Sequence, residues 1–204
     1  AHYDRRAIRH SESLLHVLNR AGIATLWRDN QTGCKGVCDG LSFESYRKPP
    51  ESSLCDDQAC RDAVMLQGLH DVIDDNPGDT VVVLHQLGNH GPAYFKRYPE
   101  ALRQFRPDCR SSDLGSCTRQ EIVNAYDNAV LYTDHFLGRA IGTLRSMSDY
   151  DTAMIYLSDH GESLGEYGLY LHGMPYNLAP EVQKHVPFVA WLDGGLGRDP
   201  GRPR

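Results

Sequence analysis

The stretch TAMIYLSDHGE, residues 152–162, carries the strongest signal for the fold. Residues 152–157 form an apolar run of strand length, and the polar residues Ser158, Asp159 and His160 follow it at once. A short continuous apolar run is typical of a strand buried in a parallel sheet. In α/β proteins, ligands bind just beyond the carboxyl ends of such strands. The stretch therefore predicts an α/β domain whose functional side chains directly follow this strand.

Three other segments have the composition of strands. Residues 23–27 are apolar and partly β-branched, and residues 80–84 form another continuous apolar run. Residues 186–192 carry a proline near their start, which predicts a further strand or an edge strand. Between the first two of these segments, residues 29–50 are rich in Gly, Asn, Ser and Pro, and this composition predicts a loop.

Apolar residues recur at helical spacing in residues 9–20, 61–73 and 118–146. The last segment is the longest, and Thr118 with Glu121 predicts a capping box at its start. Helices and strands alternate along the chain. This order predicts an α/β fold with a mostly parallel central sheet and helices on both faces.

The length and composition restrict the class of protein. A chain of 204 residues holds one domain or a piece of a larger one, and 40% hydrophobic with 24% charged residues is ordinary for a soluble globular protein. The net charge of −6 argues against a nucleic-acid partner. We assign residues 1–193 to part of one domain and residues 194–204, rich in Gly, Pro and Arg, to a flexible tail.

The six cysteines form three near-neighbour pairs. Short loops close more readily than long ones, which favours local disulfides and hence an oxidising compartment such as the periplasm. A four-cysteine zinc site made from the first two pairs is the alternative. The pairs are Cys34 with Cys38, Cys55 with Cys60, and Cys109 with Cys117.

Three histidine–glycine steps lie in predicted loops. Two of them follow predicted strands, at His90 and His160, and the third is at His172. Asp159 and His160 are adjacent at a strand end, where both side chains can point at one ion. Carboxylate and imidazole together suit zinc. His90 and His172 add ligands to the same ion, to a second ion, or to a phosphate group of the substrate.

Two further residues have weaker signals. His85 ends an apolar strand and is interpreted as a core histidine with satisfied hydrogen bonds rather than as a ligand. Lys35 lies in a glycine-flanked loop between two cysteines, where its ammonium can meet a phosphate as a point charge or remain a solvated loop lysine.

The segments around these histidines resemble a known family. Residues 158–166 (SDHGESLGE) and 171–175 (LHGMP) resemble the lipid A phosphoethanolamine transferases, which include the mobile colistin-resistance enzymes and belong to the alkaline phosphatase and sulfatase superfamily. The motifs at residues 27–30, 34–39 and 88–92 match as well, and the similarity runs from about residue 3 to residue 192.

The resemblance implies roles for individual residues. Asp159 and His160 correspond to ligands of the main catalytic zinc ion. His90 and His172 correspond to ligands of a second zinc ion or to residues that bind the donor headgroup and transfer a proton, and Lys35 and Glu162 correspond to headgroup contacts. The three local cysteine pairs match disulfides of the family.

The resemblance also implies partners and a location. The donor is phosphatidylethanolamine, the acceptor is lipid A, and one or two zinc ions take part. The expected location is the periplasmic face of the bacterial inner membrane, reached through an amino-terminal membrane domain, and the expected state is a monomer. The family's threonine nucleophile matches no position of this chain. A phosphodiesterase, phosphatase or sulfatase-like hydrolase and a catalytically incomplete zinc-binding fragment are the alternatives.

Overall fold

The computed structural model describes residues 11–46, 52–56 and 59–193. The chain divides into two compact units, Ala1–Gly88 and Asn89–Arg204. The predicted tail, residues 194–204, lies outside the described residues, as does the start of the helix predicted over residues 9–20. Among the residues described, no helix combines the length and the apolar character that crossing a membrane requires.

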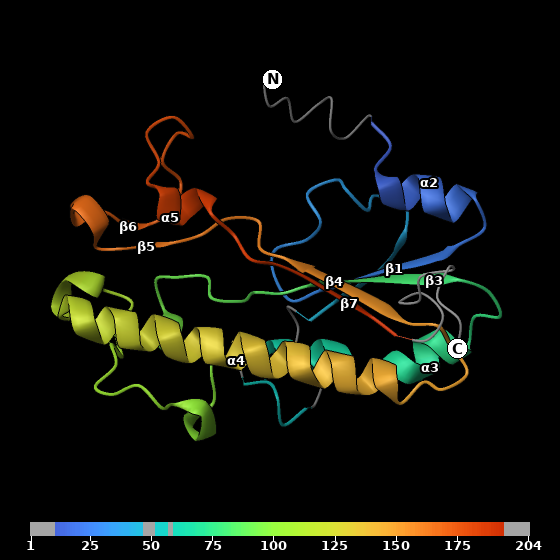
Figure 1. The fold of residues 1–204 in the computed structure, drawn as a ribbon, viewed down its shortest axis with the longest axis horizontal. Coiled ribbons are helices and arrows are strands. Elements are labelled where there is room, and N and C mark those ends of the chain that lie inside the picture. The colour runs from blue at the N-terminus through green and yellow to red at the C-terminus, as the bar shows by residue number, and fades with distance from the viewer. Residues whose placement is uncertain (1–10, 47–51, 57–58, 194–204) are drawn as a thin grey trace, which may run out of the picture. The chain divides into compact units, whose positions relative to one another are not determined.

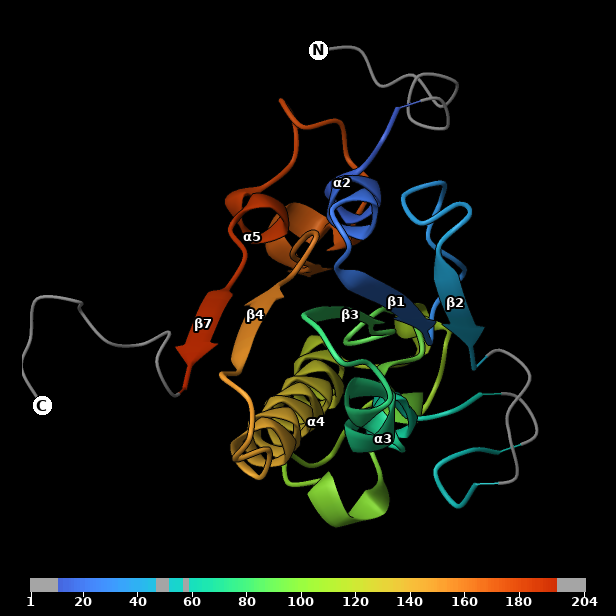
Figure 2. The ribbon, with the colours of Figure 1, turned by 90° about the vertical axis from the view of Figure 1, so that its right-hand side faces the viewer.

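The amino-terminal unit contains a parallel three-stranded sheet, two strands of which are labelled in Figure 1 and all three in Figure 2. Strand β1 (Ala24–Asp29) lies in its centre, between β2 (Ser42–Ser45) and β3 (Thr80–His85). The register of β1 and β3 places Asp29 opposite His85 at the carboxyl ends of the two strands. The parallel pairing of the two predicted strands confirms the expected α/β class.

Strand β2 corrects the expected loop over residues 29–50. Its sequence, SFES, has one apolar residue and no periodicity, so nothing local predicts a strand. The strand forms because its backbone pairs with β1, and because the Arg28 guanidinium on β1 reaches the Glu44 carboxylate on β2 at 2.7 Å. Parallel pairing of this kind is set by tertiary structure rather than by local sequence.

The helix predicted over residues 61–73 is two helices. A 3₁₀ helix, η1 (Asp62–Leu66), and α3 (Leu69–Asp74) are separated at Gly68, which has a φ of 61°. The buried Arg28 guanidinium donates hydrogen bonds of 2.8 Å to two carbonyl oxygens at this break. Those carbonyls therefore bond to a side chain instead of continuing a helix. Among the described residues of this unit, the other helix is α2 (Leu14–Arg20), with Ser13 as its N-cap.

The carboxy-terminal unit is built on the long helix α4 (Arg119–Arg145), which confirms the longest predicted helix (Figure 1). The predicted capping box is present: the Thr118 side chain accepts from the Glu121 backbone N–H, and the Glu121 carboxylate accepts from the Thr118 N–H at 2.7 Å. One face of the helix is buried, and residues Ile122 and Ala125 pack there with Tyr94.

Two antiparallel strand pairs complete this unit. Strand β4 (Ala153–Leu157) pairs with β7 (Phe188–Leu192), and Figure 2 shows the two running in opposite directions. The shorter pair is β5 (Ser163–Leu164) with β6 (Tyr170–Leu171). The remaining helices are η2 (Tyr94–Lys96), η3 (Glu100–Leu102), η4 (Leu114–Ser116), η5 (Glu166–Gly168) and α5 (Glu181–Lys184).

The burial expected for residues 152–157 is wrong for one face of β4. Ile155 and Leu157 are 71% and 59% exposed, whereas Met154 and Tyr156 are half-buried. The strand alternates because only one of its faces packs against the rest of the described unit. A continuous apolar run does not distinguish such a strand from one that is covered on both sides.

Candidate metal centre

Three histidine rings gather in the carboxy-terminal unit. The rings of His160 and His172 stack with centroids 3.8 Å apart. The ring of His90 meets them edge-on, at centroid distances of 5.1 Å from His172 and 6.4 Å from His160. The structure therefore brings together the three histidine–glycine steps that the sequence singled out.

Two of these rings are oriented in the same way. His90 Nδ1 lies 2.8 Å from the carbonyl oxygen of Gly91, and His160 Nδ1 lies 2.9 Å from that of Gly161. A carbonyl oxygen only accepts, so Nδ1 carries the proton in both residues. Nε2 of each neutral ring then keeps a lone pair for a metal ion or a proton.

The glycines after these histidines are required by space rather than by a positive φ. A Cβ on Gly161 would lie 1.9 Å from the carbonyl oxygen of Val182. A Cβ on Gly91 would lie 2.7 Å from the Tyr94 hydroxyl and 2.8 Å from Leu171 Cδ2. Each histidine can therefore approach a neighbouring segment only because the next residue has no side chain.

Glu162 supplies a carboxylate next to His160 and His172 and completes a set of three possible metal ligands. The side chain of Glu162 is 4% exposed, and its Oε1 lies 3.2 Å from His172 Nδ1. Donor atoms of His160, Glu162 and His172 all lie within 4.8 Å of one another. Two imidazoles and one carboxylate form a ligand set found in catalytic zinc sites, so the residues present fit a zinc ion.

Asp159 lies beside this group on its solvent side. Its side chain is 80% exposed, and Oδ1 is 3.8 Å from His160 Nε2. The same oxygen accepts a hydrogen bond of 3.1 Å from the His160 backbone N–H. Asp159 is thus next to the cluster but is not among the three residues whose donor atoms converge.

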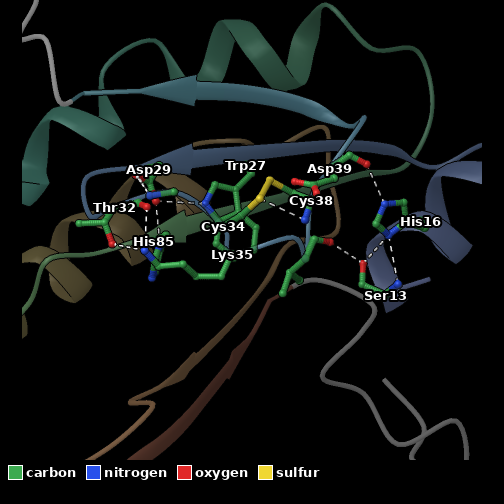
Figure 3. Close-up of a disulfide and its surroundings, with 12 residues drawn as sticks. Ser13, His16, Trp27, Asp29, Thr32, Cys34, Lys35, Cys38, Asp39 and His85 are labelled. Atoms are coloured by element: carbon green, nitrogen blue, oxygen red, sulfur yellow. Dashed lines mark hydrogen bonds and ion pairs between the residues drawn. A yellow bond between two sulfur atoms is a disulfide. The ribbon is translucent and has the colours of Figure 1, made fainter. Parts of the chain in front are cut away.

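Lys35 lies in the amino-terminal unit, on a loop closed by the Cys34–Cys38 disulfide (Figure 3). Its backbone has a φ of 54°, and its ammonium donates to the Thr32 carbonyl at 2.9 Å and to the Thr32 hydroxyl at 2.6 Å. The other end of the loop is bonded to α2, where Ser13 donates to the Val37 carbonyl. The ammonium is therefore held in place and remains exposed.

All six cysteines are paired as predicted. The disulfides are Cys34–Cys38, Cys55–Cys60 and Cys109–Cys117, and no cysteine is left for a zinc site of the four-cysteine kind.

The sequence missed the partner of His85. Asp29 is fully buried, its Oδ1 lies 2.6 Å from His85 Nδ1, and its Oδ2 accepts from the Gly33 N–H at 2.8 Å (Figure 3). Burial raises the pKa of Asp29, but the hydrogen bonds from His85 and Gly33 outweigh it and hold the pKa below its ordinary value. His85 is a bonded histidine, as interpreted, but its partner comes from another strand.

The parallel sheet and the imidazole–carboxylate set beyond a strand end are features of α/β metalloenzymes. A family model described as Sulfatase matches residues 2–200, and the chain belongs to that family.

Comparison with individual proteins narrows the similarity to one group of enzymes, the phosphoethanolamine transferases. The chain is 47% identical to the phosphoethanolamine transferase EptA of Salmonella typhimurium over 94% of its own length and 35% of that relative. It is 46% identical to the phosphatidylethanolamine transferase Mcr-1 of Escherichia coli, over 97% of its length and 38% of that protein. The chain thus spans little more than a third of these curated relatives.

A solved structure of another phosphoethanolamine transferase has the same fold as this chain. The integral membrane protein lipooligosaccharide phosphoethanolamine transferase A of Neisseria meningitidis superposes with a TM-score of 0.89 at 41% identity. The superposition covers 93% of this chain and 35% of that one.

Proposed function

We propose that this chain is part of a zinc-dependent phosphoethanolamine transferase, which moves phosphoethanolamine from phosphatidylethanolamine to the phosphates of lipid A. The observation that carries the proposal is the convergence of His160, Glu162 and His172 within 4.8 Å. This convergence occurs in a chain that is 47% identical to a phosphoethanolamine transferase. Because the chain spans about a third of its relatives, the activity is proposed for the whole enzyme.

The metal would be held by residues around His160. We assign Asp159 and His160 to the main zinc ion, because their donor atoms are 3.8 Å apart. Glu162 and His172 take a second cation, which is either another zinc ion or the ammonium of the donor headgroup. Zinc, when bound, supplies Lewis acidity, which offsets negative charge on phosphoryl oxygens and lowers the pKa of a hydroxyl nucleophile.

The remaining residues bind the headgroup and move protons. Nε2 of His90 is the atom through which this residue exchanges a proton with the reacting oxygens, because Nδ1 is bonded to Gly91. Lys35 offers an exposed ammonium to a phosphate. We assign the nucleophile to no residue of this chain.

The disulfides and the relatives support a proposal for the location and the state of the whole protein. Three disulfides form and persist in an oxidising compartment, for which we propose the periplasmic face of the bacterial inner membrane. We propose that the whole protein is a monomer and that it is anchored in that membrane, because the relative from Neisseria meningitidis is an integral membrane protein. The product carries an added amine, whose positive charge weakens the attraction of the bacterial surface for cationic polymyxins such as colistin.

A chimera tests this proposal. In Mcr-1, the segment that matches this chain is replaced by the chain, and the lipid A of bacteria producing the chimera is analysed by mass spectrometry. We expect lipid A to gain phosphoethanolamine, and expect no gain with His160→Ala. A chimera that reaches the membrane in normal amount but leaves lipid A unchanged contradicts the proposal. Release of free phosphoethanolamine instead would identify a hydrolase, the other activity that membership of the sulfatase family favours.

A further inference from the structure

The buried carboxylate of Glu162 has too few hydrogen-bond donors around it. Its side chain is 4% exposed, and the hydrogen bond recorded for its carboxylate is the one with His172 Nδ1, at 3.2 Å. A buried carboxylate normally accepts several hydrogen bonds, because each missing one leaves part of its desolvation uncompensated. A further donor is therefore expected close to Glu162.

The Tyr94 hydroxyl is such a donor without an acceptor. Tyr94 is 1% exposed, and its buried hydroxyl oxygen has no hydrogen-bond partner among the residues that the structure describes. Burial and the neighbouring Glu162 carboxylate raise the pKa of Tyr94 above its ordinary value. A buried hydroxyl without a partner destabilises the folded protein, so such a group is rare and points to a functional role.

Packing fixes the Tyr94 ring in this place. The ring meets the Tyr126 ring edge-on at 5.5 Å and belongs to the core that covers α4. Gly91 allows its hydroxyl to come close, since a Cβ there would lie 2.7 Å from it. The same Cβ would lie 2.8 Å from Leu171 Cδ2, so the hydroxyl lies beside Gly91 and Leu171, the neighbours in sequence of His90 and His172.

We propose that Tyr94 is the positioning residue of Glu162: its hydroxyl donates to the carboxylate and keeps Oε1 turned toward His172 and the cation bound there. The cation is a zinc ion or the ammonium of a phosphoethanolamine headgroup, and both need the carboxylate in one orientation. This inference rests on the proposed function for the presence of a cation. It adds Tyr94 to the residues proposed for the site, as one that acts through Glu162 and does not contact the cation.

The test compares Tyr94→Phe with a matched control, Tyr126→Phe, in the 204-residue chain. The two substitutions remove the same atom from two rings in contact, of which Tyr94 is buried and Tyr126 is partly buried. Zinc binding is measured by calorimetry, and the zinc-loaded protein is then titrated with phosphoethanolamine and with inorganic phosphate. Loss of a residue that orients a ligand typically costs 10–100-fold in affinity. We therefore expect Tyr94→Phe to weaken either zinc or phosphoethanolamine by about 10-fold or more.

The zinc titration and the phosphoethanolamine titration together identify the cation that Glu162 binds. Weaker zinc binding identifies a metal ion, and weaker phosphoethanolamine binding with unchanged phosphate binding identifies the ammonium. Either loss must disappear when Tyr94→Phe is made in a Glu162→Gln background, since a role through Glu162 needs that carboxylate.

Two results overturn the inference alone: affinities of Tyr94→Phe equal to those of Tyr126→Phe, or the same loss in the Glu162→Gln background, which would show a packing role. A wild-type chain that binds neither zinc nor phosphoethanolamine overturns both this inference and the proposed function.

Discussion

Asp29 and His85 are partners across two parallel strands, with Asp29 Oδ1 2.6 Å from His85 Nδ1. The strands β1 and β3 bring them together from positions 56 residues apart. The other carboxylate oxygen of Asp29 accepts from Gly33 and so holds the start of the loop that carries Lys35. One buried carboxylate thus ties the sheet to this loop.

We predict that Asp29→Asn lowers the free energy of unfolding by about 1–3 kcal/mol at neutral pH, because an amide cannot replace both bonds of the carboxylate. The pKa of Asp29 is lowered in the folded state, so its contribution is present at neutral pH and is lost as the pH falls below about 4. Urea unfolding at pH 7 and pH 3 measures this difference. The gap between wild type and variant should narrow at pH 3.

A matched control is Asp74→Asn. Asp74 also pairs with a histidine, His70, at 2.8 Å, but both side chains are about half exposed. Exposed pairs contribute about 0–1 kcal/mol, so we expect a change of this size at most. An Asp29→Asn effect no larger than that of Asp74→Asn, or one independent of pH, would show that burial of the pair has no energetic role.

We predict that the N-cap of α4 contributes about 1 kcal/mol to the free energy of unfolding. Thr118→Ala removes the side-chain oxygen that accepts from Glu121 N–H, and substitutions of this kind cost about 0.5–2 kcal/mol. Thr143→Ala, within the same helix, removes a hydroxyl that, in the described part of the chain, donates to the Arg139 carbonyl alone, and it should be neutral or slightly stabilising. Chemical denaturation measures both. Equal effects of the two would contradict a specific capping role.

We predict that Gly161→Ala lowers both the stability of the protein and its affinity for zinc. The new Cβ would lie 1.9 Å from the Val182 carbonyl oxygen, so the segment of α5 must move, and the bond from Gly161 N–H to the Gln183 carbonyl is lost with it. We expect destabilisation by about 2 kcal/mol or more and weaker zinc binding.

Gly142→Ala is the control for this substitution. Gly142 lies in α4 with open space around its Cβ, so alanine should stabilise the protein by about 0.5–1 kcal/mol. Thermal unfolding of the two variants should therefore move in opposite directions. A Gly161→Ala protein as stable as the wild type would mean that the close approach to Val182 is not required.

The sequence predicts those features whose signals are local. Helix α4 has its capping box, its periodicity and its length within one segment, so its bounds are predicted closely. The strand that precedes His160 is predicted from its apolar run, and the local disulfides from their spacing. The gathering of His90, His160 and His172 follows from strand ends and from the family resemblance.

Other features depend on partners that are distant in the sequence. Strand β2 forms only because β1 offers its backbone, and the break at Gly68 is stabilised by the buried Arg28. Glu162 is named by the resemblance as a headgroup contact, yet the convergence of its carboxylate with His160 and His172 is visible only in three dimensions. No local pattern reports such proximity.

Zinc titration of the chain tests the central claim most directly. Calorimetry should show zinc binding by the wild type and a loss of about 100-fold or more with His160→Ala, because His160 is assigned to the main zinc ion and is also one of the three residues whose donor atoms converge. Asp159→Ala should also weaken binding, and His135→Ala, on the exposed side of α4, should leave it unchanged. Equal zinc affinity in all four proteins would contradict the assignment of the metal centre.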